Sequence, residues 1–272
     1  MKPSLLETVK QELRSLRLKD MADMLEAALQ DAHQKQQGHI EFLHCLVQHQ
    51  RRAIDQRSLD RRIKQAKFPR KMTFEHFDWG FQPGLNVEYL KDIMQLDFIS
   101  NRQTVLILGK TGTGKTHVAT ALGVKACEAG YRVLFFKLQS LLSLLYATLA
   151  DDTTDEVIAG IARSHLLIID HVDFIRTKQD YPSLLLDLVS ACHQRVAMIF
   201  TTKISLEQWG EALGNPSVTH AIVDRILHHA KIINIRPGRS YRTEGPHAPK
   251  IEDTQELTPP KHNHVNGMNP SL

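Results

Sequence analysis

The chain has little cysteine and no long apolar run. Its three cysteines, Cys45, Cys127 and Cys192, lie far apart among 272 residues and form no C-x-x-C pair. This spacing indicates neither a zinc site nor a disulfide framework, so buried free thiols in a reducing cytoplasm are expected. No apolar run approaches the roughly 20 residues that cross a membrane, and residues 1–10 lack the layout of a secretion signal. We therefore predict a cytoplasmic protein with no membrane partner.

Positive charge is concentrated in one short stretch. Residues 51–71 contain nine Lys or Arg against two Asp, a local charge of +7, whereas the whole chain carries only +4. The remainder of the chain is therefore slightly acidic. Such a basic segment either forms a solvated helix face or attracts the phosphate backbone of a nucleic acid.

The amino-terminal quarter has a helical pattern. Apolar residues recur at helical spacing from Leu6 onward, Gly38 interrupts the pattern, and Phe68-Pro69 ends it. We predict a small helical domain over residues 1–69 and a connector over residues 70–103. At the other end, residues 243–272 are rich in Pro, Asn and His and are predicted to be a disordered tail.

Apolar strands alternate with helical patterns between residues 104 and 242. The predicted strands cover residues 104–108, 133–137, 166–170, 196–201 and 232–235. The predicted helices cover residues 117–129, 140–149, 183–193 and 219–229. Strands that are apolar along their whole length and separated by helices indicate an α/β fold, in which a parallel sheet forms the middle of three layers.

One motif specifies the chemistry of this α/β domain. The segment GKTGTGKT reads G-x-x-x-x-G-K-T, the phosphate-binding loop of P-loop NTPases, and it stands between an apolar strand and a helical pattern. Backbone N–H groups and the helix N-terminus would bind phosphate oxygens, and Mg²⁺ would accompany the nucleotide. Lys115 would reach the β- and γ-phosphates, and Thr116 would ligate the metal ion. The predicted phosphate-binding residues are Gly109, Lys110, Thr111, Gly112, Thr113, Gly114, Lys115 and Thr116.

A second strand signature supports this interpretation. Leu166-Leu167-Ile168-Ile169-Asp170 follows the lysine by about 55 residues, so Asp170 is predicted to hold Mg²⁺ with Thr116. An acidic residue is usual at the next position, where it polarises the attacking water, but this chain has His171. Histidine can act as a base near neutral pH, and Asp173 is the next acid along the chain. The alternative is that His171 is a neutral residue in a slow or inactive site.

Further candidates for catalysis follow. The fourth strand is predicted to end at Thr201-Thr202-Lys203, where Asn would be usual; Lys203 would instead contact the γ-phosphate as a point charge. Arg225 lies on the helix before the last strand, a position from which an arginine is often donated to the nucleotide of a neighbouring subunit. Arg242 is a second candidate for that role, and the alternative for both is a surface arginine or a salt-bridge partner.

These stretches together resemble a known family, the IstB-type transposition helper ATPases, which are relatives of the DnaC helicase loaders within the AAA+ superfamily. The resemblance extends over about residues 5–242. The matching segments are GKTGTGKTHVATALG (109–123), LLIID (166–170), QWG (208–210), AIVDRILHH (221–229) and SYR (240–242), and the last two are far more specific than the phosphate-binding loop.

The resemblance implies ATP as the nucleotide, oligomerisation on double-stranded DNA and recruitment of a transposase, with hydrolysis resetting the complex. It also favours DNA contact by the basic segment. Since both water-positioning residues, His171 and Lys203, depart from the family pattern, slow hydrolysis is one expectation and a non-hydrolysing ATP-binding scaffold on DNA is another. A helicase loader is a third possibility, and it would prefer single-stranded DNA.

Overall fold

The structure, a computed structural model, describes residues 4–173, 178–235 and 238–244. Within these ranges five strands form one sheet in the order β2-β3-β4-β1-β5, and every neighbouring pair is parallel. The predicted parallel α/β fold is therefore confirmed. The strands are β1 (Thr104–Leu108), β2 (Val133–Lys137), β3 (Leu166–Asp170), β4 (Ala197–Thr202) and β5 (Lys231–Asn234).

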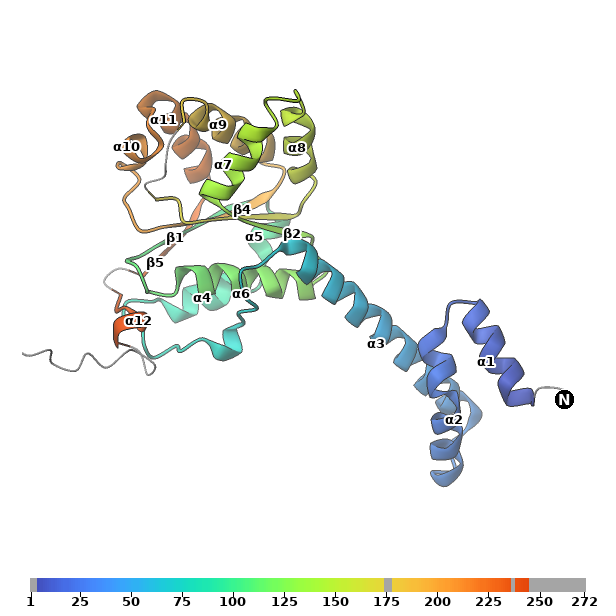
Figure 1. Ribbon diagram of the computed structural model, residues 1–272. Helices are drawn as coiled ribbons and strands as arrows, with labels where there is room; N and C mark the ends of the chain where they lie inside the picture. Colours follow the sequence, from blue (N-terminus) through green and yellow to red (C-terminus); the bar gives the residue numbers. More distant parts are fainter. Residues whose placement is uncertain (1–3, 174–177, 236–237, 245–272) are drawn as a thin grey trace, which may run out of the picture.

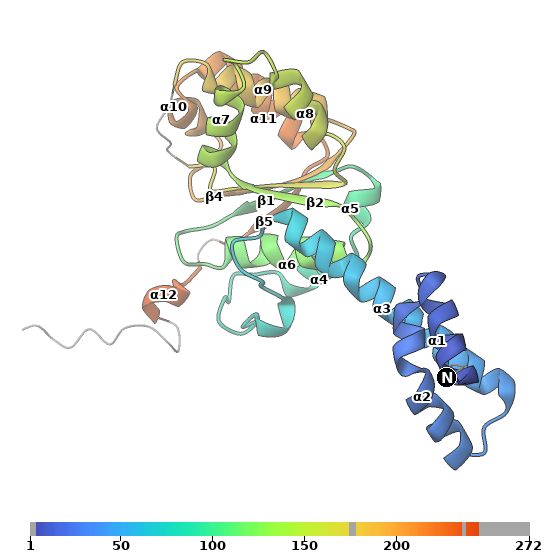
Figure 2. The same cartoon turned by 45° about the vertical axis from the view of Figure 1, so that its right-hand side comes forward.

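Helices cover both faces of the sheet, which explains why its central strands are apolar throughout. Along β1, Val105 and Ile107 face one layer and Leu106 faces the other, as the two-residue period of a strand requires. Figures 1 and 2 show the two helical layers on opposite sides of the sheet. One layer contains α7 (Leu138–Ala147), α8 (Thr154–Ile161), α9 (Tyr181–Cys192), α10 (Trp209–Leu213) and α11 (Pro216–Leu227). The other contains α4 (Val87–Ile93), α5 (Asp97–Ser100) and α6 (Lys115–Glu128).

Helices in the segment predicted as a connector belong to this second layer. Asn86 caps α4 by accepting a hydrogen bond from the backbone N–H of Tyr89 at 3.0 Å. Leu90, in α4, and Phe98, in α5, are fully buried against the sheet side that α6 covers. The short helices α4, α5, α8 and α10 were not predicted from the sequence. The domain boundaries themselves stay a prediction, and the tail from residue 245 onward lies outside the described residues.

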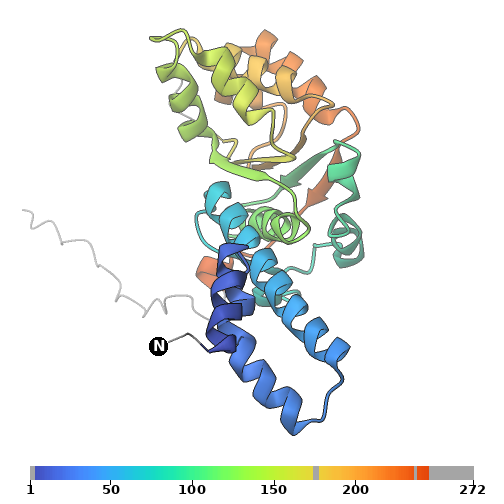
Figure 3. The same ribbon diagram turned by 90° about the vertical axis from the view of Figure 1, so that its right-hand side faces the viewer.

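The amino-terminal helices form a small unit joined to the sheet by one long helix. The helices α1 (Leu5–Ser15), α2 (Lys19–Gln34) and the first part of α3 (His39–Ala66) pack around a small apolar cluster, and Figure 3 shows α1 and α2 beside α3. With 28 residues, α3 is about 42 Å long. Its carboxyl-terminal end reaches the core, where Ala66 is fully buried and Arg62 Nε donates to the carbonyl of Cys127 at 2.8 Å. None of the helices in the described ranges has both the length and the hydropathy of a membrane span.

Close packing of α6 allows a stability prediction. A Cβ atom at Gly123 would lie 2.7 Å from Phe68 Cε1 and 2.8 Å from Ile168 Cδ1. Gly123→Val is therefore expected to lower the free energy of unfolding by roughly 1–3 kcal/mol, the usual cost of overpacking a core. Gly160→Val is the control, because a Cβ there would meet only Arg163 Nη2, at 3.7 Å. Urea unfolding of both variants checks this, and equal midpoints would contradict the packing.

Candidate nucleotide-binding site

The predicted phosphate-binding loop joins β1 to α6 at the carboxyl edge of the sheet. Gly112 and Gly114 have φ angles of 82° and 91°, which glycine adopts without strain, and Gly114 is the N-cap of α6. The loop therefore curls around the first turn of a 14-residue helix. The first N–H groups of an α-helix have no partner within the helix, and together with the positive end of the helix dipole they favour binding of an anion at this loop.

The carboxyl-terminal segment packs directly against this loop. The backbone N–H of Tyr241, the first residue of α12 (Tyr241–Glu244), donates to the carbonyl of Gly112 at 3.0 Å. A Cβ at Gly112 would clash with Ser240, whose Cα would be only 3.2 Å away. Glycine at 112 is thus required by its φ angle and also by the approach of another backbone segment. Sequence reasoning matched residues 240–242 to the family but missed this contact.

Within the loop, two side chains bond to one carbonyl. Lys115 Nζ donates to the carbonyl of Lys110 at 2.7 Å, and Thr113 Oγ1 donates to the same oxygen at 2.9 Å. The ammonium group of Lys115 is thus held against the backbone of its own loop. A flexible lysine stem permits its ammonium group to move from this carbonyl to a phosphate.

Asp170, at the end of β3, is the most constrained charged group of the site. It is fully buried, and it accepts hydrogen bonds from Thr116 Oγ1 at 3.0 Å and Thr201 Oγ1 at 2.6 Å. His171 Nδ1 lies 2.6 Å from its second oxygen. Burial opposes ionisation of this carboxyl, but the hydrogen bonds from His171, Thr201 and Thr116 outweigh it and hold the pKa of Asp170 below its ordinary value of 3.8. The carboxylate is therefore ionised at neutral pH.

The pairing of Thr116 with Asp170 suits magnesium. A hydroxyl and a carboxylate are oxygen ligands, and Mg²⁺ usually takes one or two such protein ligands while phosphates and water complete its octahedron. In the described parts of the chain, no group of three or more His, Cys, Asp or Glu side chains could hold a metal ion by itself. The residues thus fit a metal that arrives with a phosphate ligand, and they do not form a complete protein cage.

The residues predicted to position water, His171 and Lys203, follow the ends of the neighbouring strands β3 and β4, and each is bonded to residues of this strand edge. His171 has a φ of 62°, and its side chain is half exposed. Its backbone N–H donates to Thr201 Oγ1 at 3.0 Å. Asp173 accepts from the N–H of Lys203 at 2.9 Å, and Lys203 Nζ lies 3.6 Å from its other oxygen. The acid and the lysine that sequence reasoning treated separately therefore form one ion pair.

A cleft of about 520 Å³ brings most of the predicted residues together. Its lining comes from three regions: the phosphate-binding loop with the start of α6, the ends of β3 and β4, and flanking segments on either side in sequence. The lining residues are Arg70, Met72, Thr111, Gly112, Gly114, Lys115, Thr116, His117, His171, Asp173, Lys203 and Tyr241. Arg225 is not among them; it lies on α11, where its Nη1 donates to the carbonyl of Ala221 at 2.9 Å. The side chain of Arg242 lies outside the described residues.

A smaller hollow of about 130 Å³ adjoins the same loop and shares Gly114, His117 and Tyr241 with the cleft. Its walls are largely aromatic. The ring centroids of Phe81 and Tyr241 lie 4.8 Å apart, and the Phe77 ring packs edge-on against the His117 ring with centroids 5.2 Å apart. An aromatic-lined hollow beside a phosphate-binding loop suits a nucleotide base. Sequence reasoning missed these residues, although aromatic residues at positions 74, 77, 79 and 81 were a usable signal.

Comparisons with known proteins agree with this geometry. The model of the family described as IstB-like ATP binding protein matches residues 11–247. A Pseudomonas aeruginosa protein, named as an ATP-binding protein of insertion sequence IS21, is 33% identical over 230 residues, which cover 85% of this chain and 86% of the relative. A Mycobacterium tuberculosis protein, named as an ATP-binding protein in an insertion sequence, is 31% identical over 231 residues, covering 85% of this chain and 92% of the relative.

Solved structures show the same fold at lower identity. DnaA from Aquifex aeolicus, solved with bound AMPPCP, aligns with a TM-score of 0.53 and 22% identity, over 65% of this chain and 53% of DnaA. The α/β domain thus has the AAA+ P-loop fold, as predicted. From the family match and the identity to the insertion-sequence relatives, the chain belongs to the IstB-like ATP-binding protein family.

Proposed function

We propose that this protein is an ATP-dependent helper of transposition that binds double-stranded DNA, assembles with copies of itself and recruits a transposase. The observation that carries the proposal is the contact of Thr116 with Asp170 beneath a glycine loop at a helix N-terminus. This arrangement suits Mg²⁺ with a nucleoside triphosphate. The membership of its relatives in insertion sequences supports the role in transposition.

In this proposal each residue of the site has a distinct role. The loop N–H groups and Lys115 bind the phosphates, and Thr116 and Asp170 hold Mg²⁺, with Thr201 fixing the carboxylate by its hydrogen bond. Mg²⁺ would neutralise charge on the phosphate oxygens. During hydrolysis, water attacks the γ-phosphorus, the bond to the β–γ bridging oxygen breaks, and His171 or Asp173 takes the proton from water.

Arg225 would act in an assembly rather than in its own chain. It does not line the cleft, and it lies on α11, in the helical layer opposite the one that contains α6. An arginine in that position supports donation to the nucleotide of a neighbouring copy, where it would stabilise charge in the transition state. The self-assembly that we propose would thus complete the catalytic site.

A second candidate function is an ATP-binding scaffold on DNA that does not hydrolyse. It is favoured by two contacts: His171 bonds to Asp170, and Lys203 pairs with Asp173. Both candidates for positioning water are therefore engaged with carboxylates. Phosphate release measured with and without double-stranded DNA separates the two functions. DNA-stimulated release supports the ATPase, whereas tight ATP binding without release supports the scaffold. A preference for single-stranded DNA would favour a helicase loader.

The basic segment is where we expect DNA to bind, but its arginines are not equivalent. Arg57 makes a bidentate pair with Asp20, at 2.6 and 2.8 Å, and Arg62 bonds to Cys127. Arg51, Arg52 and Arg61 are exposed and have only weak contacts or none in the described ranges, the shortest being 3.5 Å from Arg61 to Ser58. These three are therefore the better candidates for phosphate contacts.

Replacing Arg51, Arg52 and Arg61 together with alanine is expected to weaken DNA binding at every sequence tested. Each lost phosphate contact should also reduce the slope of log K against log salt concentration by about 1. Fluorescence anisotropy with a labelled duplex at several salt concentrations measures both effects.

The control variant loses the same amount of positive charge from other surfaces. In it, alanine replaces Lys91, Arg163 and Arg195, which are exposed on the α/β domain. If both triple variants bind equally well and with equal slopes, the basic segment is only a solvated helix face.

A further inference from the structure

The nucleotide cleft contains a cation that no sequence motif predicts. Arg70 lies four residues beyond the end of α3, and it lines the cleft with Lys115, His171 and Lys203. Arg57 and Arg62, earlier in the same basic segment, are each engaged with a protein oxygen. By contrast, no hydrogen bond or ion pair within the described residues engages the Arg70 guanidinium.

The backbone around Arg70 is fixed on both sides. On one side, Phe68 packs against α6 at Gly123 and meets the Phe135 ring edge-on, with centroids 6.1 Å apart. On the other side, His117 Nε2 lies 2.8 Å from the carbonyl oxygen of Thr73. Only four residues separate these two anchors, so the position of Arg70 is set by the α6 helix that also carries Lys115. The backbone that carries Arg70 therefore loses little freedom when its side chain binds a ligand.

The choice of ligand follows from the rest of the lining. In the proposed function Lys115, Thr116, His171 and Lys203 act at the terminal phosphate, and Arg70 lines the same cleft as these four residues. Arg70 does not line the aromatic hollow that suits the base. A planar guanidinium with paired donors matches phosphate oxygens well. We propose that Arg70 contacts the terminal phosphate of a bound nucleoside triphosphate and so distinguishes triphosphate from diphosphate.

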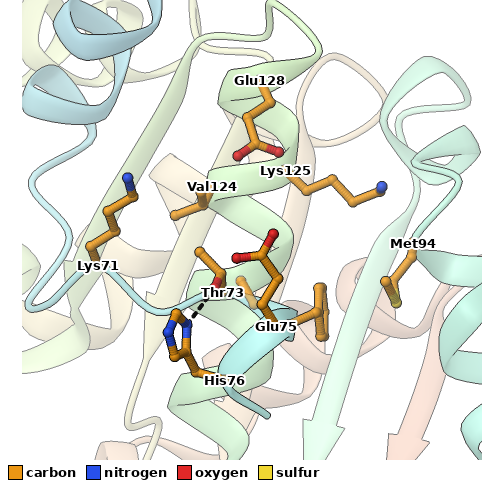
Figure 4. A pocket seen from close by; sticks show the side chains of 10 residues that line it. Lys71, Thr73, Glu75, His76, Met94, Val124, Lys125 and Glu128 are labelled. Carbon is orange, nitrogen blue, oxygen red and sulfur yellow. Dashed lines mark hydrogen bonds between the residues drawn. The ribbon is translucent and has the colours of Figure 1, made fainter.

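This assignment rests on the proposed nucleotide binding, and the chain provides a matched control for it. Lys71, the next residue, carries the same charge but lines a different pocket. That pocket lies between residues 71–76, which include η1 (Phe74–His76), and the second half of α6. Figure 4 shows Lys71 there, opposite Lys125 and near Thr73, which is hydrogen-bonded to His76. Replacing Lys71 therefore removes one positive charge from this region without removing a side chain from the nucleotide cleft.

The experiment is calorimetric titration of the full chain with Mg²⁺ and either AMPPCP or ADP. Arg70→Ala is expected to weaken AMPPCP binding by about ten- to a hundredfold, the range for a hydrogen bond to a charged group, and ADP binding by much less. Arg70→Lys should recover only part of the loss, because a point charge lacks the paired donors. Lys71→Ala should leave the ratio of the two affinities as in the wild type.

The outcomes separate this assignment from the proposed function. If wild type binds both nucleotides and Arg70→Ala keeps the wild-type affinity ratio, or if Lys71→Ala shifts it equally, the assignment is wrong while the proposed function stands. If wild type binds neither nucleotide, both are wrong. Thermal unfolding of Arg70→Ala without nucleotide should match wild type, since this side chain has no partner among the described residues; a variant that fails to fold would contradict that placement.

Discussion

Lys115→Ala is expected to weaken binding of Mg²⁺-ATP by about a hundredfold or more. The lysine is the one side chain of the loop that would bond to two phosphates, and each charge-assisted hydrogen bond contributes roughly 1.5–3 kcal/mol. In the structure Lys115 lines the cleft, and its ammonium group lies 2.7 Å from the carbonyl of Lys110. The fold should survive the change, because the hydrogen bond of Lys115 to the carbonyl of Lys110 is exposed. Calorimetry measures the affinity.

The control for this prediction comes from the same loop. Lys110→Ala removes an exposed positive charge but keeps the backbone carbonyl that Lys115 and Thr113 share. It should change ATP affinity far less than Lys115→Ala. Assembly that depends on ATP, followed by light scattering, should be lost only in the Lys115 variant. Assembly that persists in Lys115→Ala would contradict the link between nucleotide binding and oligomerisation.

The second large effect is expected at Asp170. Asp170→Asn keeps the size of the side chain but removes the charge that would hold Mg²⁺, so DNA-stimulated phosphate release should fall by at least about a hundredfold, the lower end for losing an electrostatic group from a catalytic site. The stimulation of AMPPCP binding by Mg²⁺ should also disappear. Because the pKa of Asp170 lies below 3.8, wild type should keep this Mg²⁺ dependence over the whole neutral pH range.

Asp187→Asn is the matched control for Asp170→Asn, since Asp187 is an exposed acid on α9. Its phosphate release and Mg²⁺ dependence should equal those of wild type. Thermal unfolding should show that Asp170→Asn still folds, because asparagine can accept the hydrogen bonds of Thr116 and Thr201 through its carbonyl oxygen. Undiminished phosphate release in the Asp170 variant would mean that another group holds the metal.

The central strands were predictable because burial on both faces leaves them apolar along their whole length. The predicted limits of β2 and β3 agree with the structure, and those of β4 and β5 differ by one residue at each end. The helices α5 and α10 were not predicted, since four or five residues give too few turns to show a period. Segment 70–103 was interpreted as a connector because its turn residues obscured the cap at Asn86.

The site was predictable only where neighbouring residues in sequence determine it. The phosphate-binding loop is one short segment whose glycines and helix start can be recognised together. By contrast, the ion pair of Asp173 with Lys203 depends on the adjacency of β3 and β4, and the contact of Tyr241 with Gly112 joins segments about 130 residues apart. Such pairings follow from sheet order and packing, which no local pattern encodes. The catalytic roles of His171, Asp173, Lys203 and Arg225 stay predictions.

The central claim is that the loop from Gly109 to Thr116 binds a triphosphate at the N-terminus of α6. Calorimetric titration of the purified wild-type chain with AMPPCP in the presence of Mg²⁺ tests it most directly. We predict saturable binding of one nucleotide per chain, tighter with Mg²⁺ than with a chelator present. A titration with no binding heat at several temperatures, and no nucleotide retained on equilibrium dialysis, would contradict the claim.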